Sequence, residues 1–185
     1  MTRLVAAASP LVAARLFAAA DGIPNNPERP ALLLAGVFDG PLDPDDIDAL
    51  VRSHGWGGTW TWSVFPFHHY HPNAFEVLVV AAGNARLMLG GSAGEAFDVR
   101  AGDVVALPPG TGHCRLEASP DFAVCGAYPP GQEDYETLRA GAATVEQVAA
   151  RIAAVPAPVT DPIYGGEGPI VSAWPQRFES DAWGH

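Results

Sequence analysis

Cysteine is scarce in this sequence, and the two that occur form no recognisable framework. Only Cys114 and Cys125 are present among 185 residues, and no CxxC pair occurs. They could face each other on paired strands, but two thiols without such spacing are typical of a reduced protein, because small secreted domains that depend on disulfides carry several spaced cysteines. Both are therefore predicted to be core thiols, and the protein to be cytoplasmic.

Basic residues are also few. Lys and Arg together number 10 against 21 Asp and Glu, which gives a formal net charge of -11. A nucleic-acid backbone or an anionic membrane surface is bound through a patch of basic side chains, and no segment resembles a helix-turn-helix module. We therefore expect neither nucleic acid nor a membrane as partner, and a small molecule as ligand.

Long apolar runs are missing as well. Residues 4–21 (LVAAASPLVAARLFAAAD) superficially resemble a signal peptide that ends in three alanines, but Ser9-Pro10 and Arg15 interrupt the apolar stretch. A divergent signal over residues 1–20 remains the alternative. No run reaches the roughly 18 apolar residues that a membrane-spanning helix needs.

Turn residues, in contrast, are plentiful. The 20 glycines and 18 prolines are spread between short apolar runs, which is typical of many short strands joined by tight turns. The length suits one domain, and no internal repeat is present. We expect an all-β chain with an N-terminal strand and a Pro/Asn-rich connector over residues 1–30, a β-barrel over 31–130, and a C-terminal helix and extended arm over 131–185 packing on the barrel.

Individual elements follow from periodicity and capping residues. Six runs predict strands: TWTWSVF, FEVLVVA, ARLMLG, DVVALP, HCRLEAS and FAVCGAY. Asp43 ahead of Pro44, with Gly55 after an apolar face, predicts a short helix on the outside of the barrel. Thr144 with Gln147 forms a capping-box signature for a second helix, which Pro156 ends. Residues 157–178 are expected to be the extended arm.

The segment HHYHPNAFE, residues 68–76, carries the chemistry. Side chains two apart on a strand share a face, so His69 and His71 project together. Pro72-Asn73 predicts a turn, after which Glu76 can offer a carboxylate to the same point, and His113 follows a second turn sequence. Three nitrogens and one oxygen suit one divalent transition metal (Fe, Mn, Ni, Zn, Co or Cu) better than Ca or Mg.

These residues fall into two spaced motifs. Residues 69–83 read His-x-His-x4-Glu-x6-Gly, and residues 102–113 read Gly-x5-Pro-x-Gly-x2-His, which together resemble the two signatures of the cupin superfamily. The segments IPNNP, GWGG, PFHHYH, LPPGTGH and GAYPPGQ extend the resemblance to uncharacterised bacterial single cupins of the YjlB type. The resemblance implies a double-stranded β-helix, a jelly-roll-like barrel with a few short peripheral helices, and His69, His71, Glu76 and His113 as metal ligands.

Two positions depart from the cupin pattern. Ser63 stands where the first motif usually opens with Gly, and Glu117 stands where the second usually closes with Asn. Glu117 and Arg115 share strand parity with His113, so they are candidates for substrate binding in the cavity, where a cation could anchor a carboxylate; an ion pair at the rim is the alternative. His68 is expected to face away from the metal, unless a one-residue slip of register exchanges it with His69.

Four protein ligands on a six-coordinate metal leave two positions open, which is typical of a catalytic centre. We expect a metal-dependent enzyme that acts on a small polar organic molecule by dioxygenase, isomerase or lyase chemistry. The alternatives are a non-catalytic barrel that binds or senses a small ligand, and a degenerate barrel that holds no metal tightly. Long apolar terminal arms further suggest a homodimer.

Overall fold

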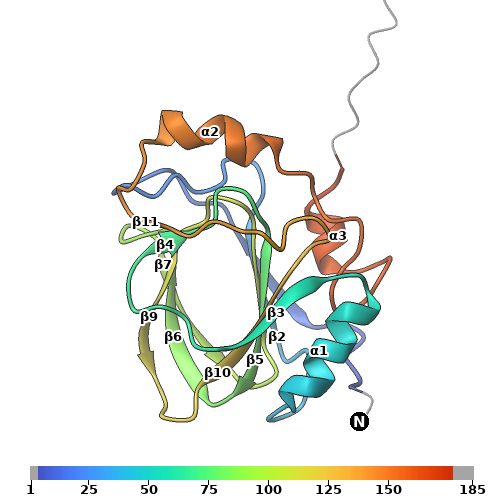
Figure 1. The fold of residues 1–185 in the computed structure, drawn as a ribbon. Helices are drawn as coiled ribbons and strands as arrows, with labels where there is room; N and C mark the ends of the chain where they lie inside the picture. Colours follow the sequence, from blue (N-terminus) through green and yellow to red (C-terminus); the bar gives the residue numbers. More distant parts are fainter. Residues whose placement is uncertain (1–3, 177–185) are drawn as a thin grey trace, which may run out of the picture.

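Two antiparallel sheets face each other and enclose the interior of the molecule (Figure 1). The structure is a computed structural model and describes residues 4–176. The six-stranded sheet, in spatial order, consists of β1 (Leu11–Arg15), β2 (Ala31–Ala35), β8 (Val104–Leu107), β5 (Glu76–Ala82), β10 (Ala123–Tyr128) and β3 (Gly57–Trp62). The five-stranded sheet consists of β11 (Leu138–Arg139), β4 (His69–Tyr70), β9 (His113–Ala118), β6 (Asn84–Leu89) and β7 (Glu95–Arg100). The predicted all-β jelly-roll-like architecture is therefore present.

Each of the six predicted runs contains a strand, but three further strands, β2, β7 and β11, were not predicted. The sequence of β7, EAFDVR, carries three charged residues and is largely exposed, so its apolar alternation is weak. The two residues of β11 are too few to show any period. Strand β4 also ends one residue earlier than expected, at Tyr70, so His71 lies in the connection that follows, just before Pro72.

Strand β5 separates two apolar cores. Its even-numbered residues Leu78 and Val80 belong to the core between the two sheets. Its odd-numbered residues Val77 and Val79 belong to a second core, on the outer face of the six-stranded sheet. This explains why six of its seven residues are buried, since a strand covered on both faces reads as a continuous apolar run. Glu76 has the parity of Leu78, which places its carboxylate inside the barrel.

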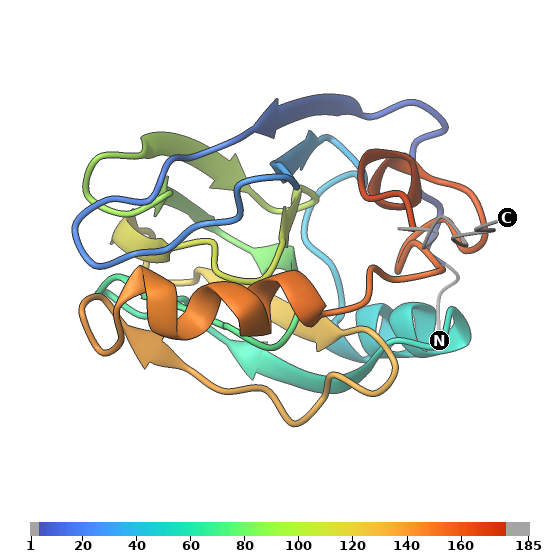
Figure 2. The same cartoon turned by 90° about the horizontal axis from the view of Figure 1, so that it is seen from above.

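The two predicted helices are present with the predicted caps. Helix α1 (Pro44–Ser53) begins after Asp43, whose side chain accepts a hydrogen bond from the backbone N–H of Asp45, and it contributes residues to the outer core. Helix α2 (Val145–Ala154) has the complete capping box of Thr144 and Gln147. In Figures 1 and 2, α1 lies outside the six-stranded sheet, whereas α2 lies across one end of the barrel.

The segment after α2 is not the extended arm that was expected. It turns back on itself and forms a short third helix, α3 (Pro169–Ala173), which contributes Ile170 to the same outer core as α1. Trp174 is fully buried with its ring 4.8 Å from that of Phe75. Tertiary packing of such apolar side chains, which are separated by prolines and glycines in the sequence, overrides the extended pattern. The end of the predicted arm and of the predicted 131–185 segment, and residues 1–3 of the first segment, lie outside the described residues.

Cys114 and Cys125 are both buried, free thiols. Over residues 4–176 no helix combines the length and the apolar character needed to cross a bilayer.

Candidate metal centre

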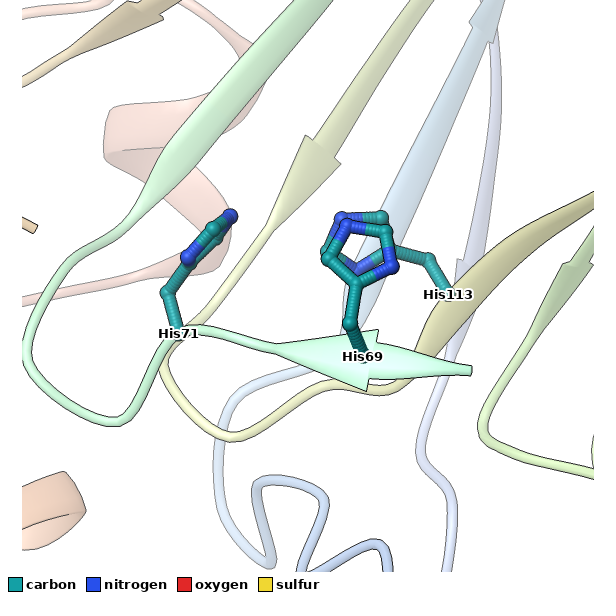
Figure 3. A group of neighbouring side chains, drawn as sticks. All are labelled: His69, His71 and His113. Carbon is teal, nitrogen blue, oxygen red and sulfur yellow. The ribbon is translucent and has the colours of Figure 1, made fainter. Parts of the chain in front are cut away.

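Three buried histidines meet inside the barrel, at the end of the five-stranded sheet (Figure 3). His69 on β4 pairs directly with His113 on β9, and their ring centroids are 4.0 Å apart. His71, two residues further along the chain, lies on the same side. One potential ligand atom from each of the three lies within 4.8 Å of the others. Residues 44 positions apart in the sequence are thus brought together by strand pairing.

Each imidazole is held by a backbone carbonyl through its Nδ1 atom. The Nδ1 contacts are 3.0 Å from His69 to Phe67 O, 2.8 Å from His71 to Glu136 O, and 3.1 Å from His113 to Thr111 O. A carbonyl oxygen only accepts hydrogen bonds, so each Nδ1 carries the proton and donates it. In the neutral imidazole, Nε2 then bears a free lone pair, which is the state that a metal ligand requires.

Glu76 brings a carboxylate from the opposite sheet. Its Oε1 accepts a hydrogen bond of 2.6 Å from the hydroxyl of Tyr128. Its Oε2 is buried and makes no hydrogen bond, yet lies 3.3 Å from Nε2 of both His71 and His113. Buried polar atoms are rarely left unsatisfied, and acceptor lone pairs facing one another at this distance repel. A cation between them removes both costs, so the residues present fit a metal ion.

The acid–base properties of the group follow from burial and from mutual contacts. Burial, with the nearby His113, lowers the pKa of His69 to about 3. Burial also opposes protonation of His71, but the Glu76 carboxylate outweighs it and raises the pKa of His71. Although burial disfavours its charge, the pKa of Glu76 lies well below its usual value because of His71 and His113. The ionised carboxylate therefore favours a proton on Nε2 of His71 when no cation is present, and a divalent ion would take the place of that proton.

The four predicted ligands thus come together as two overlapping groups. The three imidazoles form one, and Glu76 with His71 and His113 forms the other.

A cavity of about 300 Å³ opens over these groups. Besides the histidines and Glu76, its wall contains Trp60, Trp62, Ser63, Val64, Phe65, Leu78, Tyr128, Tyr135 and Thr137. Trp60 donates to the Tyr128 hydroxyl at 2.9 Å, which extends the chain of hydrogen bonds from Glu76. A Cβ at Gly126 would lie 2.2 Å from the Trp60 ring, so glycine is what lets this ring cross β10.

The candidate substrate-binding residues do not line this cavity. Arg115 donates to the hydroxyl of Ser63 at 2.8 Å and so reaches the cavity wall only through that serine. Glu117 is exposed and lies in a separate surface depression with Arg86 and Asp98. One of the two departures from the motif pattern, Ser63, is therefore at the cavity, and the other is remote from it.

His68 lies just before β4 and, unlike its neighbour His69, is not part of the histidine cluster. Its Nε2 is 3.7 Å from Sγ of Cys114, and its Nδ1 is buried without a hydrogen-bond partner. His69, and not His68, is paired with His113. The slipped register is therefore not the one observed.

The residues that support the candidate metal centre were not predicted from the sequence. Tyr128 contacts Glu76 across 52 positions, and Tyr135 stacks on Tyr128 with ring centroids 4.0 Å apart. Tyr128 lies in a predicted strand with the parity of Val124, which is in the core between the sheets. This shared parity could have indicated that Tyr128 points into the barrel, but the sequence did not show which face of the strand is internal.

Comparison with known proteins agrees with this architecture. The model of the cupin domain family matches residues 62–119, which include the three histidines and Glu76. The uncharacterized protein YjlB of Bacillus subtilis is 38% identical over 153 residues, which cover 82% of this chain and 90% of that protein.

Solved structures give more distant matches. An 11S globulin from Brassica napus, procruciferin, shares 15% identity at a TM-score of 0.37, over 62% of this chain and 28% of its own. Oxalate decarboxylase from Bacillus subtilis shares 18% at 0.34, over 61% and 24%. Acireductone dioxygenase from Bacillus anthracis, with a cadmium ion in its active centre, shares 17% at 0.33, over 45% and 56%. The chain spans only about a quarter of the length of the first two.

Proposed function

Since the chain belongs to the cupin superfamily, in the group that includes YjlB, we propose that it binds one divalent transition metal through His69, His71, Glu76 and His113. The observation that carries the proposal is the buried Oε2 of Glu76, which has no hydrogen-bond partner and lies 3.3 Å from Nε2 of both His71 and His113. The donor set of imidazoles and one carboxylate suits Fe, Mn, Ni, Zn, Co or Cu.

We further propose that the metal serves an enzyme acting on a small polar organic molecule. When bound, such an ion supplies Lewis acidity toward an oxygen atom of the substrate. The residues of the chain do the rest: backbone carbonyls fix the imidazole tautomers, and the hydroxyl of Tyr128 fixes the carboxylate. Aromatic and aliphatic side chains make up most of the cavity wall, which makes it largely apolar. Dioxygenase, isomerase and lyase reactions are all compatible with this arrangement, because a fold does not determine a reaction.

One observation favours a second candidate, a non-catalytic barrel that captures or senses a small ligand. Among the described residues that line the cavity, Glu76 and the three histidines are the only carboxylate and imidazole groups, and the other candidates for proton transfer are the phenols of Tyr128 and Tyr135. If all four hold the metal, no carboxylate or imidazole is left to move a proton. Metal-dependent turnover or oxygen consumption supports the enzyme, whereas thermal stabilisation by a ligand without product supports the binding protein.

Elemental analysis of protein purified without a His-tag tests the metal site. We expect about one equivalent of a transition metal per chain, and its loss in His71→Ala, because a missing imidazole leaves the remaining donors too few to retain the ion through dialysis. His68→Ala is the matched control, since His68 neighbours the same strand but is not part of the histidine cluster. Equal metal content in wild type and His71→Ala would contradict the proposed ligand set.

A further inference from the structure

Aromatic rings border the three histidines from two directions. Phe65 stands edge-on to His69, with ring centroids 5.1 Å apart, and itself meets Trp62 edge-to-face at 5.3 Å. On the other side, Tyr135 stands edge-on to His71 at 5.0 Å and stacks on Tyr128. The cluster of imidazoles therefore lies at the base of a space that has an aromatic pair beside His69 and another beside His71.

Packing in the apolar core does not account for the positions of these rings. The side chain of Trp62 is 58% exposed at the mouth of the cavity, and Phe65 and Tyr135 are only partly buried. Large aromatic side chains gain most when they are covered, and they pair preferentially with other flat rings in stacked or edge-to-face geometry. An exposed tryptophan beside a concave site is therefore a surface ready to be covered by a ligand.

The same cavity offers no cation away from the metal centre. Among its described lining residues there is no arginine or lysine, and Glu76 is the only acid. Arg115 and Arg139 do not line the cavity. The guanidinium of Arg115 donates a hydrogen bond to Ser63, and that of Arg139 lies 3.8 Å from the ring centroid of Phe67. A ligand with a charged group remote from the metal would lose its hydration there without gaining an opposite charge, which is costly.

We propose that the substrate or ligand of this cavity is a flat, uncharged aromatic molecule of one or two rings, with a single polar edge that faces the metal. The volume of about 300 Å³ is at the lower end of ligand sites, which limits the size. The placement of the polar edge rests on the proposed metal function, whereas the affinity for the ring rests on the aromatic wall alone. Within the class of small polar organic molecules, the expected substrate is therefore an aromatic hydroxyl compound and not a dicarboxylate.

Three probes with one carbon skeleton test this by isothermal titration calorimetry on the purified full-length protein. We expect 2-naphthol to bind about fivefold or more tightly than decahydro-2-naphthol, which has the same hydroxyl but no flat ring. We expect no measurable binding of 2,6-naphthalenedicarboxylate, whose second carboxylate meets no cation. Equal affinity for the flat and saturated alcohols, or binding of the dicarboxylate, would overturn the proposal.

Variants of Trp62 give the matched comparison. Trp62→Ala should weaken binding of 2-naphthol about fivefold, and Trp62→Phe should restore most of it, because the phenyl ring keeps a flat face. Leu116→Ala, which changes another exposed apolar side chain outside the cavity, should leave the affinity unchanged. Circular dichroism checks that each variant is folded, and an unchanged affinity in folded Trp62→Ala counts against the proposal.

The two proposals fail separately. If the protein holds no metal but still prefers 2-naphthol, and this preference depends on Trp62, the proposal of an aromatic ligand stands and the proposal of a metal site is wrong. If the protein holds metal in a manner that depends on His71 but shows no preference for the flat ring, the proposal of a metal site stands and the proposal of an aromatic ligand is wrong.

Discussion

The hydroxyl of Tyr128 decides which oxygen of Glu76 is free. It donates to Oε1, and Trp60 donates to it in turn, so that Oε2 alone is left toward the histidines. Burial, followed by the charge of Glu76, raises the pKa of Tyr128, which keeps the phenol protonated and able to donate. The candidate metal centre therefore contains a carboxylate whose orientation is set by a phenol.

Tyr128→Phe tests this orientation. The variant leaves Oε1 buried without its donor, so we expect metal affinity to fall about tenfold, as when other groups that orient metal ligands are removed. Competition with a chelator measures the change. Tyr164→Phe is the control, because its hydroxyl bonds to Ala7 O far from the metal centre, and metal affinity should not change. An unaltered affinity in Tyr128→Phe would show that Glu76 needs no such support.

Residue spacing predicts part of this site and not the rest. The positions of His69 and His71 on one face follow from strand geometry, and the motif resemblance supplied His113 and Glu76. Tyr128, Tyr135 and Trp60 come from separate strands and loops, and their contacts depend on how the two sheets are paired. Arg115 had the parity of His113, but parity did not show that its guanidinium bonds to Ser63 and does not line the cavity.

Among the elements, the C-terminal segment differs most from its prediction. Asp161 is fully buried and organises this segment: Oδ1 accepts from the N–H groups of Ile163 and Tyr164, and Oδ2 accepts from that of Ile170. One carboxylate therefore satisfies three backbone donors of a segment with little regular structure. It holds Ile163 and Ile170 in the outer core.

Asp161→Ala removes the acceptor from these buried N–H groups. We expect the free energy of unfolding to fall by about 3 kcal/mol, because unsatisfied buried donors are costly. Asp161→Asn keeps one acceptor oxygen and should lose less. Urea denaturation gives both values, with the exposed Asp121→Ala as control, which should change stability by less than about 0.5 kcal/mol. A loss under about 1 kcal/mol in Asp161→Ala would mean that the segment is held by apolar packing alone.

Elements specified by neighbouring residues were predicted well, and those specified by distant contacts were not. The capping residues of α1 and α2 lie within three positions of the donors they serve, so the sequence shows both helix starts. Strand β7 is an edge strand with charged residues, and it is defined by its pairing with β6. The turns around Asp161 depend on a core that only the folded chain forms.

Strand β1 forms one edge of the six-stranded sheet, and no further described strand covers it. Strand β1 pairs with β2 on one side, and Leu11 and Val12 expose 79% and 47% of their surface. An exposed apolar edge strand invites pairing with another chain, so the expected homodimer remains a proposal with β1 as its contact.

Light scattering after gel filtration tests the dimer. We expect a mass of about twice the 19.3 kDa chain at micromolar concentration, and a shift toward the single-chain mass in Leu11→Glu, because a charge at the contact must be desolvated. Leu116→Glu, at an exposed site on β9, should leave the dimer intact. Wild-type protein with the mass of one chain would refute the dimer.

The four proposed metal ligands belong to both halves of the barrel. His69 and His113 are on the five-stranded sheet, and Glu76 begins β5 of the six-stranded sheet. An ion held by them would link the two sheets, which are otherwise joined there by side-chain packing. Loss of the ion would remove this link, so we expect metal content to affect the stability of the barrel as well as the chemistry inside it.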